Sequence, residues 1–303
     1  MTSLNHSLKS FILVISVLVS AVGCTQKLGR IPLPIQRDQG LVPLEILEDI
    51  TYEAKLIQSG GYLYATGGGE GFGTYNLNSF AFFSGRGILY SSQGGHNFFG
   101  NSTPKSVTAM VKTPSYLVIS SGTGLTLVDV SNPAFPRVDS VLTGPGTLWT
   151  SAVYDPSSNK VLGFIGNQMF KLDLTLKTLV GTPQTIPDLS CGRGATQFNG
   201  KIYIAGCNSL WEYSGGSFKQ FYYAINAIDV VGNNGLLYVH HRPVRGIGGV
   251  NVRAGIYVYD VSSTSPSYQG SIPLDPESFA ISQDNQYIFS NDNDEDVAVY
   301  RIP

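Results

Sequence analysis

The chain has 303 residues, a formal net charge of −2 and only 13% charged residues, against roughly 25% in ordinary soluble domains. A mildly acidic chain without a stripe of Lys and Arg is a poor candidate for nucleic-acid binding, because phosphates require clusters of cations. Its 35 glycines suit strands joined by frequent turns, since glycine accepts the positive φ that hairpins require.

Residues 1–23 form a predicted export signal. Lys9 precedes an apolar run, FILVISVLVSA at 11–21, which is too short to span about 30 Å of hydrocarbon as a helix. The run ends in A-V-G-C, which resembles the lipobox of bacterial lipoproteins, where small residues precede a lipidated cysteine. The resemblance implies lipidation at Cys24, although Ala21 departs from the preferred Leu. The alternative is an ordinary cleaved signal peptide with an incidental cysteine.

The residues after the signal define the expected location. Thr25, and not Asp, follows Cys24, which in similar Gram-negative lipoproteins implies the outer membrane of the cell envelope. Residues 24–40 would hold the lipidated cysteine and a tether, and 41–303 a single domain. Two or more acyl chains anchor a protein stably, so we expect the membrane as a permanent partner.

A short phrase recurs along the rest of the chain: a tight polar turn, alternating aromatic and aliphatic residues, and a small-residue loop. The copies read GGYLYATGG (60–68), PSYLVISSG (114–122), SNKVLGFIG (158–166), NGKIYIAG (199–206), NNGLLYVHH (233–241) and DNQYIFSND (284–292). Units repeated roughly every 35 to 55 residues are typical of stacked β-modules, and four-stranded units form a β-propeller. We therefore predict an all-β propeller of six blades, with a degenerate seventh around 84–93 as the alternative.

The ring needs a closing strand. The last copy supplies only three strands within 279–302, so a fourth must come from elsewhere. The segment LVPLEIL at 41–47 is strand-like, and we expect it to pair with the last blade. That pairing would remove two exposed sheet edges, which are otherwise sites of aggregation.

Two stretches carry a family resemblance. Residues 106–143 contain SVTAMVK, YLVISSG and GLTLVDVSNPAFP, and 255–274 repeat the pattern with GIYVYDVSSTSP. They resemble the LVIVD repeat of bacterial propellers, whose third strand ends in V-D-V-S-x-P. NGKIYIAG is also similar to a Kelch strand, but most of the paired glycines and the Trp of Kelch blades are missing. The resemblance implies a propeller over most of 50–302.

Cys191 and Cys207 are the cysteines that remain beside Cys24. They flank a hairpin whose turn is near Asn199 and Gly200, so they should lie nearly opposite each other on neighbouring strands. Export would place them in an oxidising compartment, and we predict a disulfide. The alternative is a pair of buried thiols one register step out of reach.

The longest loops are predicted to lie on one face of the propeller, between second and third strands and between blades. Loops carry function on rigid scaffolds, and exposed aromatic and Arg side chains are frequent interface anchors. The predicted partner contacts are Phe98, Phe99, His240, His241, Arg242 and Arg245. The alternatives are that the arginines pair with the acidic turn at 291–296, or that the loops only cap the channel.

The acidic turn NDNDED at 291–296 is a candidate calcium site. Asp292, Asp294 and Asp296 stand at alternate positions, and carboxylates so spaced can converge on Ca²⁺. The glycine and the distant Glu of an EF-type loop are absent, so a solvated turn is the default. We expect no other cofactor.

Local enzyme motifs are absent from the sequence: it has no G-x-S-x-G, HExxH, P-loop or sialidase box. We therefore predict a monomeric binding or scaffold module for a protein or glycan partner. The alternative is a hydrolase or lyase whose site is assembled from several blades at the channel mouth. Converging His, Asp and Glu there would favour the enzyme, and an apolar or Arg-rich rim would favour binding.

Overall fold

The computed structural model describes residues 45–47, 55–67, 71–77, 88–91, 107–122, 124–133, 136–207, 209–222, 226–247, 250–263, 266–291 and 297–302. Every regular element among them is a β-strand. The contacts divide the chain into residues 1–33 and 34–303, and all the described residues belong to the second unit.

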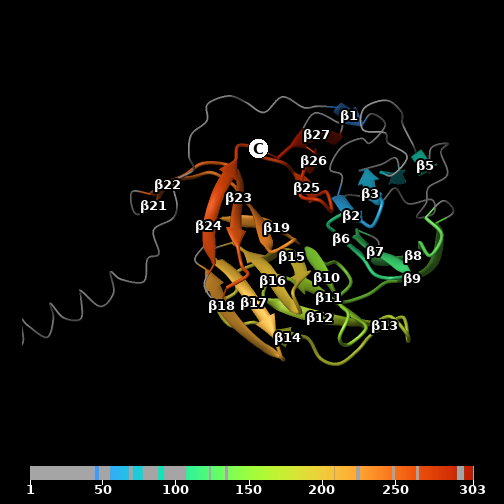
Figure 1. Ribbon diagram of the computed structural model, residues 1–303. Helices are drawn as coiled ribbons and strands as arrows, with labels where there is room; N and C mark the ends of the chain where they lie inside the picture. Colours follow the sequence, from blue (N-terminus) through green and yellow to red (C-terminus); the bar gives the residue numbers. More distant parts are fainter. Residues whose placement is uncertain are drawn as a thin grey trace, which may run out of the picture. The chain divides into compact units, whose positions relative to one another are not determined.

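The strands form six antiparallel sheets of four or five strands, here called blades 1 to 6 in chain order. The innermost strands, β2, β6, β10, β15, β19 and β25, surround a common axis (Figure 1). Each contacts the innermost strand of the next blade, and β25 contacts β2, so the ring is continuous. The predicted all-β propeller is confirmed, with six blades among the described residues.

The strands of the first three blades follow one another in the chain. Blade 1 comprises β2 (Lys55–Ser59), β3 (Tyr62–Gly67), β4 (Gly71–Asn76) and β5 (Ile88–Ser91). Blade 2 comprises β6 (Ala109–Lys112), β7 (Tyr116–Ser121), β8 (Gly124–Asp129) and β9 (Arg137–Leu142). Blade 3 comprises β10 (Ser151–Asp155), β11 (Lys160–Ile165), β12 (Gln168–Asp173), β13 (Thr178–Leu179) and β14 (Gln184–Thr185).

Blades 4 to 6 repeat the plan with one insertion. Blade 4 comprises β15 (Gly192–Phe198), β16 (Lys201–Gly206), β17 (Ser209–Ser214) and β18 (Ser217–Tyr222). Blade 5 comprises β19 (Ala227–Asn233), β20 (Leu236–His241), β23 (Gly255–Asp260) and β24 (Ser267–Ile272), with a separate hairpin of β21 (Val244–Ile247) and β22 (Val250–Val252) between its second and third strands. Blade 6 comprises β25 (Ser278–Ile281), β26 (Tyr287–Asn291), β27 (Val297–Arg301) and β1 (Glu45–Leu47).

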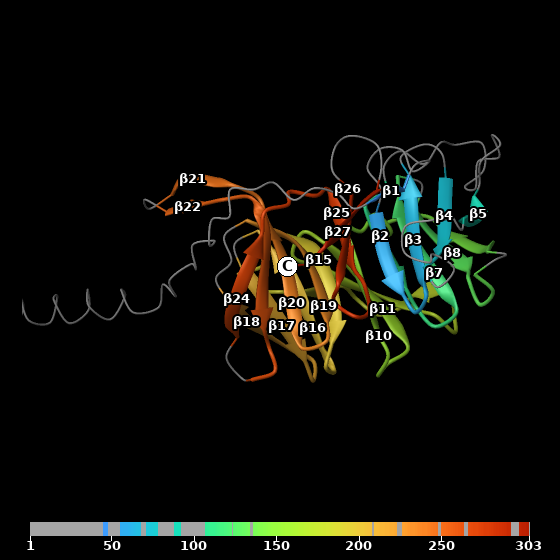
Figure 2. The ribbon, with the colours of Figure 1, turned by 45° about the horizontal axis from the view of Figure 1, so that its top comes forward.

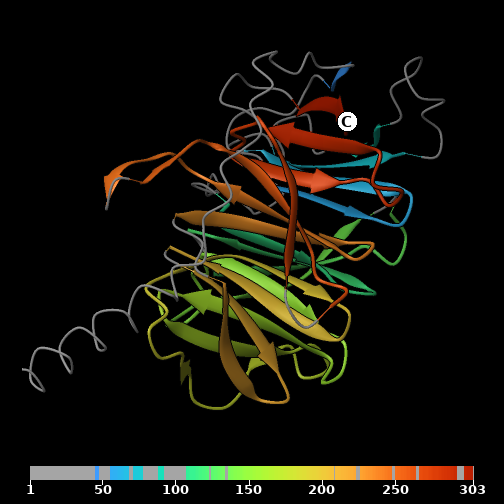
Figure 3. The same cartoon turned by 60° about the vertical axis from the view of Figure 1, so that its left-hand side comes forward.

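Blade 6 closes the ring as predicted. Its outermost strand, β1, comes from the other end of the propeller sequence and pairs antiparallel with β27, with Ile46 opposite Ala298. Figure 3 shows the blue β1 beside the dark-red strands of the last blade. The first and last described strands are therefore neighbours in one sheet.

The repeated turn residues form tight hairpins. Asn199 and Gly200 have φ of 50° and 72° between β15 and β16, and Asn234 and Gly235 have φ of 44° and 87° between β19 and β20. Two successive residues with positive φ are the signature of a two-residue type I′ turn, which matches the twist of the flanking strands. The Asn-Gly pairs in the sequence therefore set the position of the turn between the first and second strands of blades 4 and 5.

The core lies between successive blades. One cluster joins blades 2 and 3 and contains Leu125, Leu127, Trp149, Val161 and Leu172, all fully buried. Similar apolar layers lie between blades 3 and 4, 5 and 6, 6 and 1, and 1 and 2. Blades 1, 2, 3 and 6 are therefore held by apolar side chains on both of their faces.

The acid that ends several third strands has a structural role. Asp129 Oδ1 accepts a hydrogen bond from the Ser131 amide at 3.0 Å, and Asp260 Oδ1 accepts one from the Ser262 amide at 2.8 Å. These bonds form local turns that end the strand. Hydrogen bonds from the Ser131 hydroxyl and amide lower the pKa of Asp129. The V-D-V-S pattern is explained by this turn.

Candidate functional site

The six innermost strands enclose a central cavity of about 310 Å³. The polar and charged residues that line it are Lys55, Gln58, Thr108, Thr150, Ser151, Arg193, Thr196, Asp229, Asn233 and Ser278. Most of them stand at or next to the first residue of an innermost strand. Because each innermost strand is the first of its blade and all run the same way, these residues gather at one end of the cavity, here called the mouth.

Hydroxyl groups at the mouth tie neighbouring blades together. Thr108 Oγ1 donates to the carbonyl of Trp149, which leads into blade 3, at 2.5 Å. Thr150 Oγ1 donates to the carbonyl of Gly192 in blade 4, also at 2.5 Å. Ser278 Oγ of blade 6 accepts from a backbone amide of β2 in blade 1 at 3.2 Å. These three side chains link neighbouring blades, and their hydroxyl groups already have hydrogen-bond partners.

Blades 4 and 5 depart from this arrangement, because both contain a β-bulge at the mouth. The ladder between β15 and β16 shifts between Gly192 and Gly194, and the ladder between β19 and β20 shifts between Ala227 and Asp229. Arg193 is thus the extra residue of the first bulge, and bulges commonly re-aim side chains near functional sites. A Cβ at Gly194 would lie 2.6 Å from Asp229 Cα, so only glycine leaves room for the aspartate.

Asp229 is the carboxylate of the cavity. Burial raises its pKa to about 6, against the opposing effects of the Lys55 charge and of the Val230 amide, which donates to Asp229 Oδ1 at 2.9 Å. Lys55 begins β2 and lines the same cavity. The mouth therefore combines one carboxyl group that is costly to ionise with two cations, Lys55 and Arg193.

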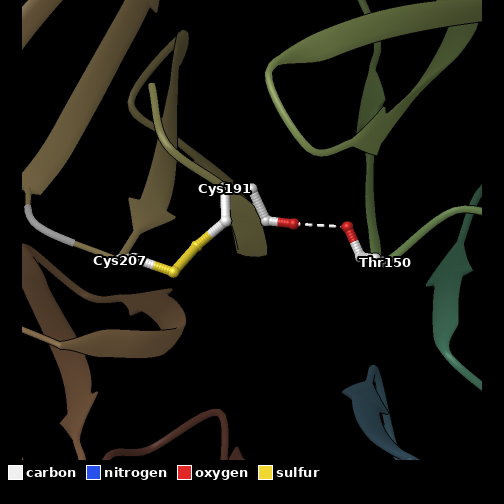
Figure 4. Close-up of a disulfide and its surroundings, with 4 residues drawn as sticks. Thr150, Cys191 and Cys207 are labelled. Atoms are coloured by element: carbon white, nitrogen blue, oxygen red, sulfur yellow. Dashed lines mark hydrogen bonds between the residues drawn. A yellow bond between two sulfur atoms is a disulfide. The ribbon is translucent and has the colours of Figure 1, made fainter. Parts of the chain in front are cut away.

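The predicted disulfide is confirmed beside this bulge. Cys191 and Cys207 are bonded, with their Cα atoms 5.6 Å apart. Figure 4 shows the bridge next to the hydrogen bond from Thr150 to the Gly192 carbonyl. The bridge joins the start of β15 to the end of β16, so it clamps the strand on which Arg193 stands.

Two predicted partner contacts need correction. His240 and His241 are only 1% and 2% exposed, so a partner cannot touch them in this structure. His240 Nε2 lies 2.8 Å from Asp275 Oδ1, and the His241 ring packs 4.5 Å from that of Tyr257. Their strand, β20, is covered on both faces by neighbouring sheets, so alternation along the strand exposes neither ring. Burial lowers the pKa of His240, although the hydrogen bond with Asp275 acts in the opposite direction.

Among the described residues of the long-loop face, Arg242, Arg253 and Leu148 are exposed. Arg242 is exposed and lies 3.5 Å from the Glu277 carboxylate. Arg245 lies in β21 of the inserted hairpin, which stands away from the blades in Figure 2. Arg253, after the hairpin, is exposed, and Leu148, in the connection between blades 2 and 3, is 53% exposed. In the described part of this face, Arg242 pairs with a carboxylate of another loop, and Leu148, between blades 2 and 3, faces solvent.

The remaining predicted site residues lie outside the described residues. They are Cys24, Phe98, Phe99, Asp292, Asp294 and Asp296. Within the described ranges, no group of three or more His, Cys, Asp or Glu side chains is placed to hold a metal ion. The same ranges contain no helix long and apolar enough to cross a membrane.

The sequence analysis did not predict Lys55, Arg193 and Asp229 as site residues, although the sequence contains a signal for them. Lys55, Arg193 and Asp229 interrupt three innermost strands that are otherwise apolar, small or weakly polar: KLIQS, GRGATQF and AIDVVGN. A charge at the start of a strand that lines the axis of a propeller is unusual because charged groups are seldom buried without partners. Recognising these charged positions requires an alignment of the first strands of the six blades, and these strands have no shared motif.

No protein-family model and no curated protein sequence matches this chain. Solved structures match it by shape. A chain of the mitotic checkpoint complex has 13% identity and a TM-score of 0.58, over 89% of this chain and 94% of that one. U3-55K has 8% identity and a TM-score of 0.60, over 85% and 98%. The WD40 repeats of RRP9 have 9% identity and a TM-score of 0.55, over 86% and 100%.

These likenesses agree with the strand order in defining a β-propeller. At 8–13% identity they bear on the fold alone. The function must therefore be argued from the residues of the mouth and of the long-loop face.

Proposed function

We propose that this protein is a binding module whose long-loop face binds a protein partner. A glycan is the second partner class expected from the sequence analysis. The observation that carries the proposal is that Leu148, Arg242 and Arg253 are exposed and, with Arg245, lie in connections on the same side of the propeller as the mouth. Exposed apolar and Arg side chains around a concave site are typical of protein interfaces. One similar structure is itself a chain of a multi-protein complex, which supports this choice of partner.

The chemistry of the mouth also supports binding over catalysis. Its described lining has one carboxylate, Asp229, and no histidine, and it has two cations. A hydrolytic site assembled from several blades would bring an acid and a base, or metal ligands, into reach of one another. The described lining contains Asp229 but no second carboxylate and no histidine.

The binding test compares two matched pairs of substitutions at opposite ends of the propeller. Leu148→Ala with Arg242→Ala removes an exposed leucine and an ion-paired arginine from the long-loop face. Leu176→Ala with Arg137→Ala removes the same residue types from the opposite end, where third strands connect to fourth strands. Leu176 lies in the β12–β13 turn and is 66% exposed, and Arg137 begins β9 and pairs with Asp129 at 3.1 Å.

Each purified variant is used to capture partners from envelope extracts, and the captured protein is then titrated. We expect the long-loop variant to bind at least about tenfold more weakly, since truncating two anchors removes on the order of 2 kcal/mol. The other variant should bind like the wild type, and both should melt normally. Equal binding by both variants, or loss only with the Leu176 and Arg137 pair, would refute the assigned face.

We further propose that the propeller is held at the bacterial outer membrane through a lipidated Cys24. The order of a positive charge, an apolar run, small residues and a cysteine supports this. Cys24→Ser should abolish acyl labelling and release the protein from the membrane fraction, whereas Cys191→Ser should leave labelling intact. Retention of the Cys24→Ser protein in membranes would contradict the anchor.

A further inference from the structure

We infer that the cavity mouth is a binding site for a carboxylate group of a polypeptide, either a chain terminus or an acidic side chain, held by Lys55 and Arg193. This rests on the proposed function, because it names the part of the docked partner that enters the axis of the propeller. Two features of the described residues carry it: cations that form no ion pair with a described carboxylate, and the shortage of free hydrogen-bonding groups.

Neither cation lies within ion-pair distance of a described carboxylate, although the Lys55 charge acts on Asp229 through space. Lys55 and Arg193 both line the cavity, and within the described residues the side chain of neither forms an ion pair or hydrogen bond. Some other described cations are paired, for example Lys177 with Asp139 at 2.7 Å and Lys201 with Glu212 at 3.2 Å. Lys55 is half-buried and Arg193 is exposed, so both are accessible to a bound anion, and hydrogen bonds between charged groups are stronger than those between neutral ones.

The shape and chemistry of the cavity favour a peptide over a sugar. Its volume of about 310 Å³ is at the small end of the roughly 300–1,000 Å³ typical of ligand pockets. A sugar ring presents many hydroxyls that each require a partner, yet Thr108, Thr150 and Ser278 are already bonded to neighbouring blades. A single charged group at the end of an apolar or small segment fits the few groups that remain.

Asp229 would couple this binding to protons. Its protonated carboxyl can donate to a bound carboxylate, whereas its ionised form would repel one. The titratable or charged groups on the elements around it are Lys55 on β2, Arg193 on β15, His240 opposite it on β20, and Asp275 and Glu277 before β25. Binding should therefore be strongest below about pH 6, where Asp229 is protonated, and weaken as the pH rises through that value.

The experiment uses three defined probes on the purified propeller: N-acetyl-triglycine, its carboxamide, and glucuronate, each followed by calorimetry or NMR titration. The acid should bind and the carboxamide should not. Lys55→Gln and Arg193→Gln should each weaken binding of the acid about tenfold, the usual size of a lost charge-assisted hydrogen bond. Lys219→Gln, which removes an exposed cation from β18, is the control and should bind like the wild type.

The pH series adds a readout that loss of folding would not mimic. The wild type should lose affinity between about pH 5 and 7, and Asp229→Asn should bind with nearly constant affinity over that range. Equal binding of acid and carboxamide, or full binding by the Lys55 and Arg193 variants, would overturn the site. Binding of glucuronate alone would overturn the choice of a peptide.

The outcome is separable from the proposed function. If the probes fail to bind while the Leu148 and Arg242 variant still loses its partner, the docking face stands and the carboxylate site is wrong. If the probes bind as expected while that variant keeps its partner, the docking face is wrong and the cavity is a site for free carboxylates.

Discussion

Asp229 is the carboxylate of the central cavity, and its ionised form is unfavourable there. Burial raises its pKa to about 6, from 3.8 in the unfolded chain. Between these values the folded protein binds more protons than the unfolded chain, so stability falls as the pH rises from about 4 to about 6. At neutral pH the charge then lowers stability by on the order of 2–3 kcal/mol.

Asp229→Asn should therefore stabilise the protein at pH 7.5, because the amide has the shape of the protonated acid without its charge. The gain should disappear near pH 4, where the wild-type carboxyl is itself neutral. Melting temperatures measured across this range test the prediction, with exposed Asp188→Asn as the control. A loss of stability at pH 7.5 would mean that the charge is structural, through its attraction to Lys55.

The disulfide is the second residue-scale feature with a measurable effect. Cys191 and Cys207 are separated by 16 residues, and closing a loop of this length stabilises by about 3 kcal/mol in the chain-entropy treatment. The double variant Cys191→Ser/Cys207→Ser should lower the urea midpoint accordingly. Reducing agent should have no further effect on it. An unchanged midpoint would show that the surrounding strands hold the bulge without the bridge.

At the scale of elements, the turns were the most predictable part of the molecule. Asn-Gly pairs have few conformations to choose from, so the sequence placed the β15–β16 and β19–β20 hairpins well. The bulges were not predictable, because Gly192–Gly194 and Ala227–Asp229 have no shared signature and arise from packing against the next blade. Arg193 and Asp229, which stand at these bulges, were missed for that reason.

The burial of His240 and His241 was missed for a related reason. A strand on the outside of a single sheet exposes alternate side chains, but β20 lies between two blades and both its faces are covered. Local patterning cannot distinguish the two situations when the buried residues are polar. Arg242, the residue directly after β20, is exposed.

The element-scale prediction concerns Gly200, which has a φ of 72° and open space around a hypothetical Cβ. Gly200→Ala should cost about 1 kcal/mol, because alanine resists positive φ even where nothing obstructs it. Gly200→Asn should cost less, since Asn accepts this conformation. Urea denaturation measures both. Equal losses for the two variants would indicate that the turn changes type and that positive φ is not the cause.

At the scale of the whole molecule, closure by β1 makes the six blades one ring. The repeated phrase predicted six blades, and the short last repeat predicted a closing strand from 41–47; β1 at Glu45–Leu47 confirms it. The seventh blade considered around 84–93 is instead the region of β5, the fourth strand of blade 1. The order of blades followed from the sequence because each hairpin repeats locally.

Ile46→Pro should open this closure, since proline fixes φ at about −65°, away from the extended strand conformation, in a strand of only three residues. We expect a lower melting temperature and concentration-dependent association, because the edge of β27 is then exposed. Ile46→Val keeps the backbone amide and is the control. Size-exclusion chromatography at several concentrations detects the association, and a monomeric Ile46→Pro variant of normal stability would show that β1 is dispensable.

Closure also sets the order in which this protein can be completed. The strand β1 is synthesised before blade 1, whereas its partner β27 is made last, so nearly the whole propeller is translated between them. At roughly 5–20 residues per second, β1 waits on the order of ten seconds or more without a partner. A chain that stalls before β27 therefore has a free strand and an open ring at once. Such a nascent chain would be recognisable to a chaperone or protease by these two unpaired edges alone.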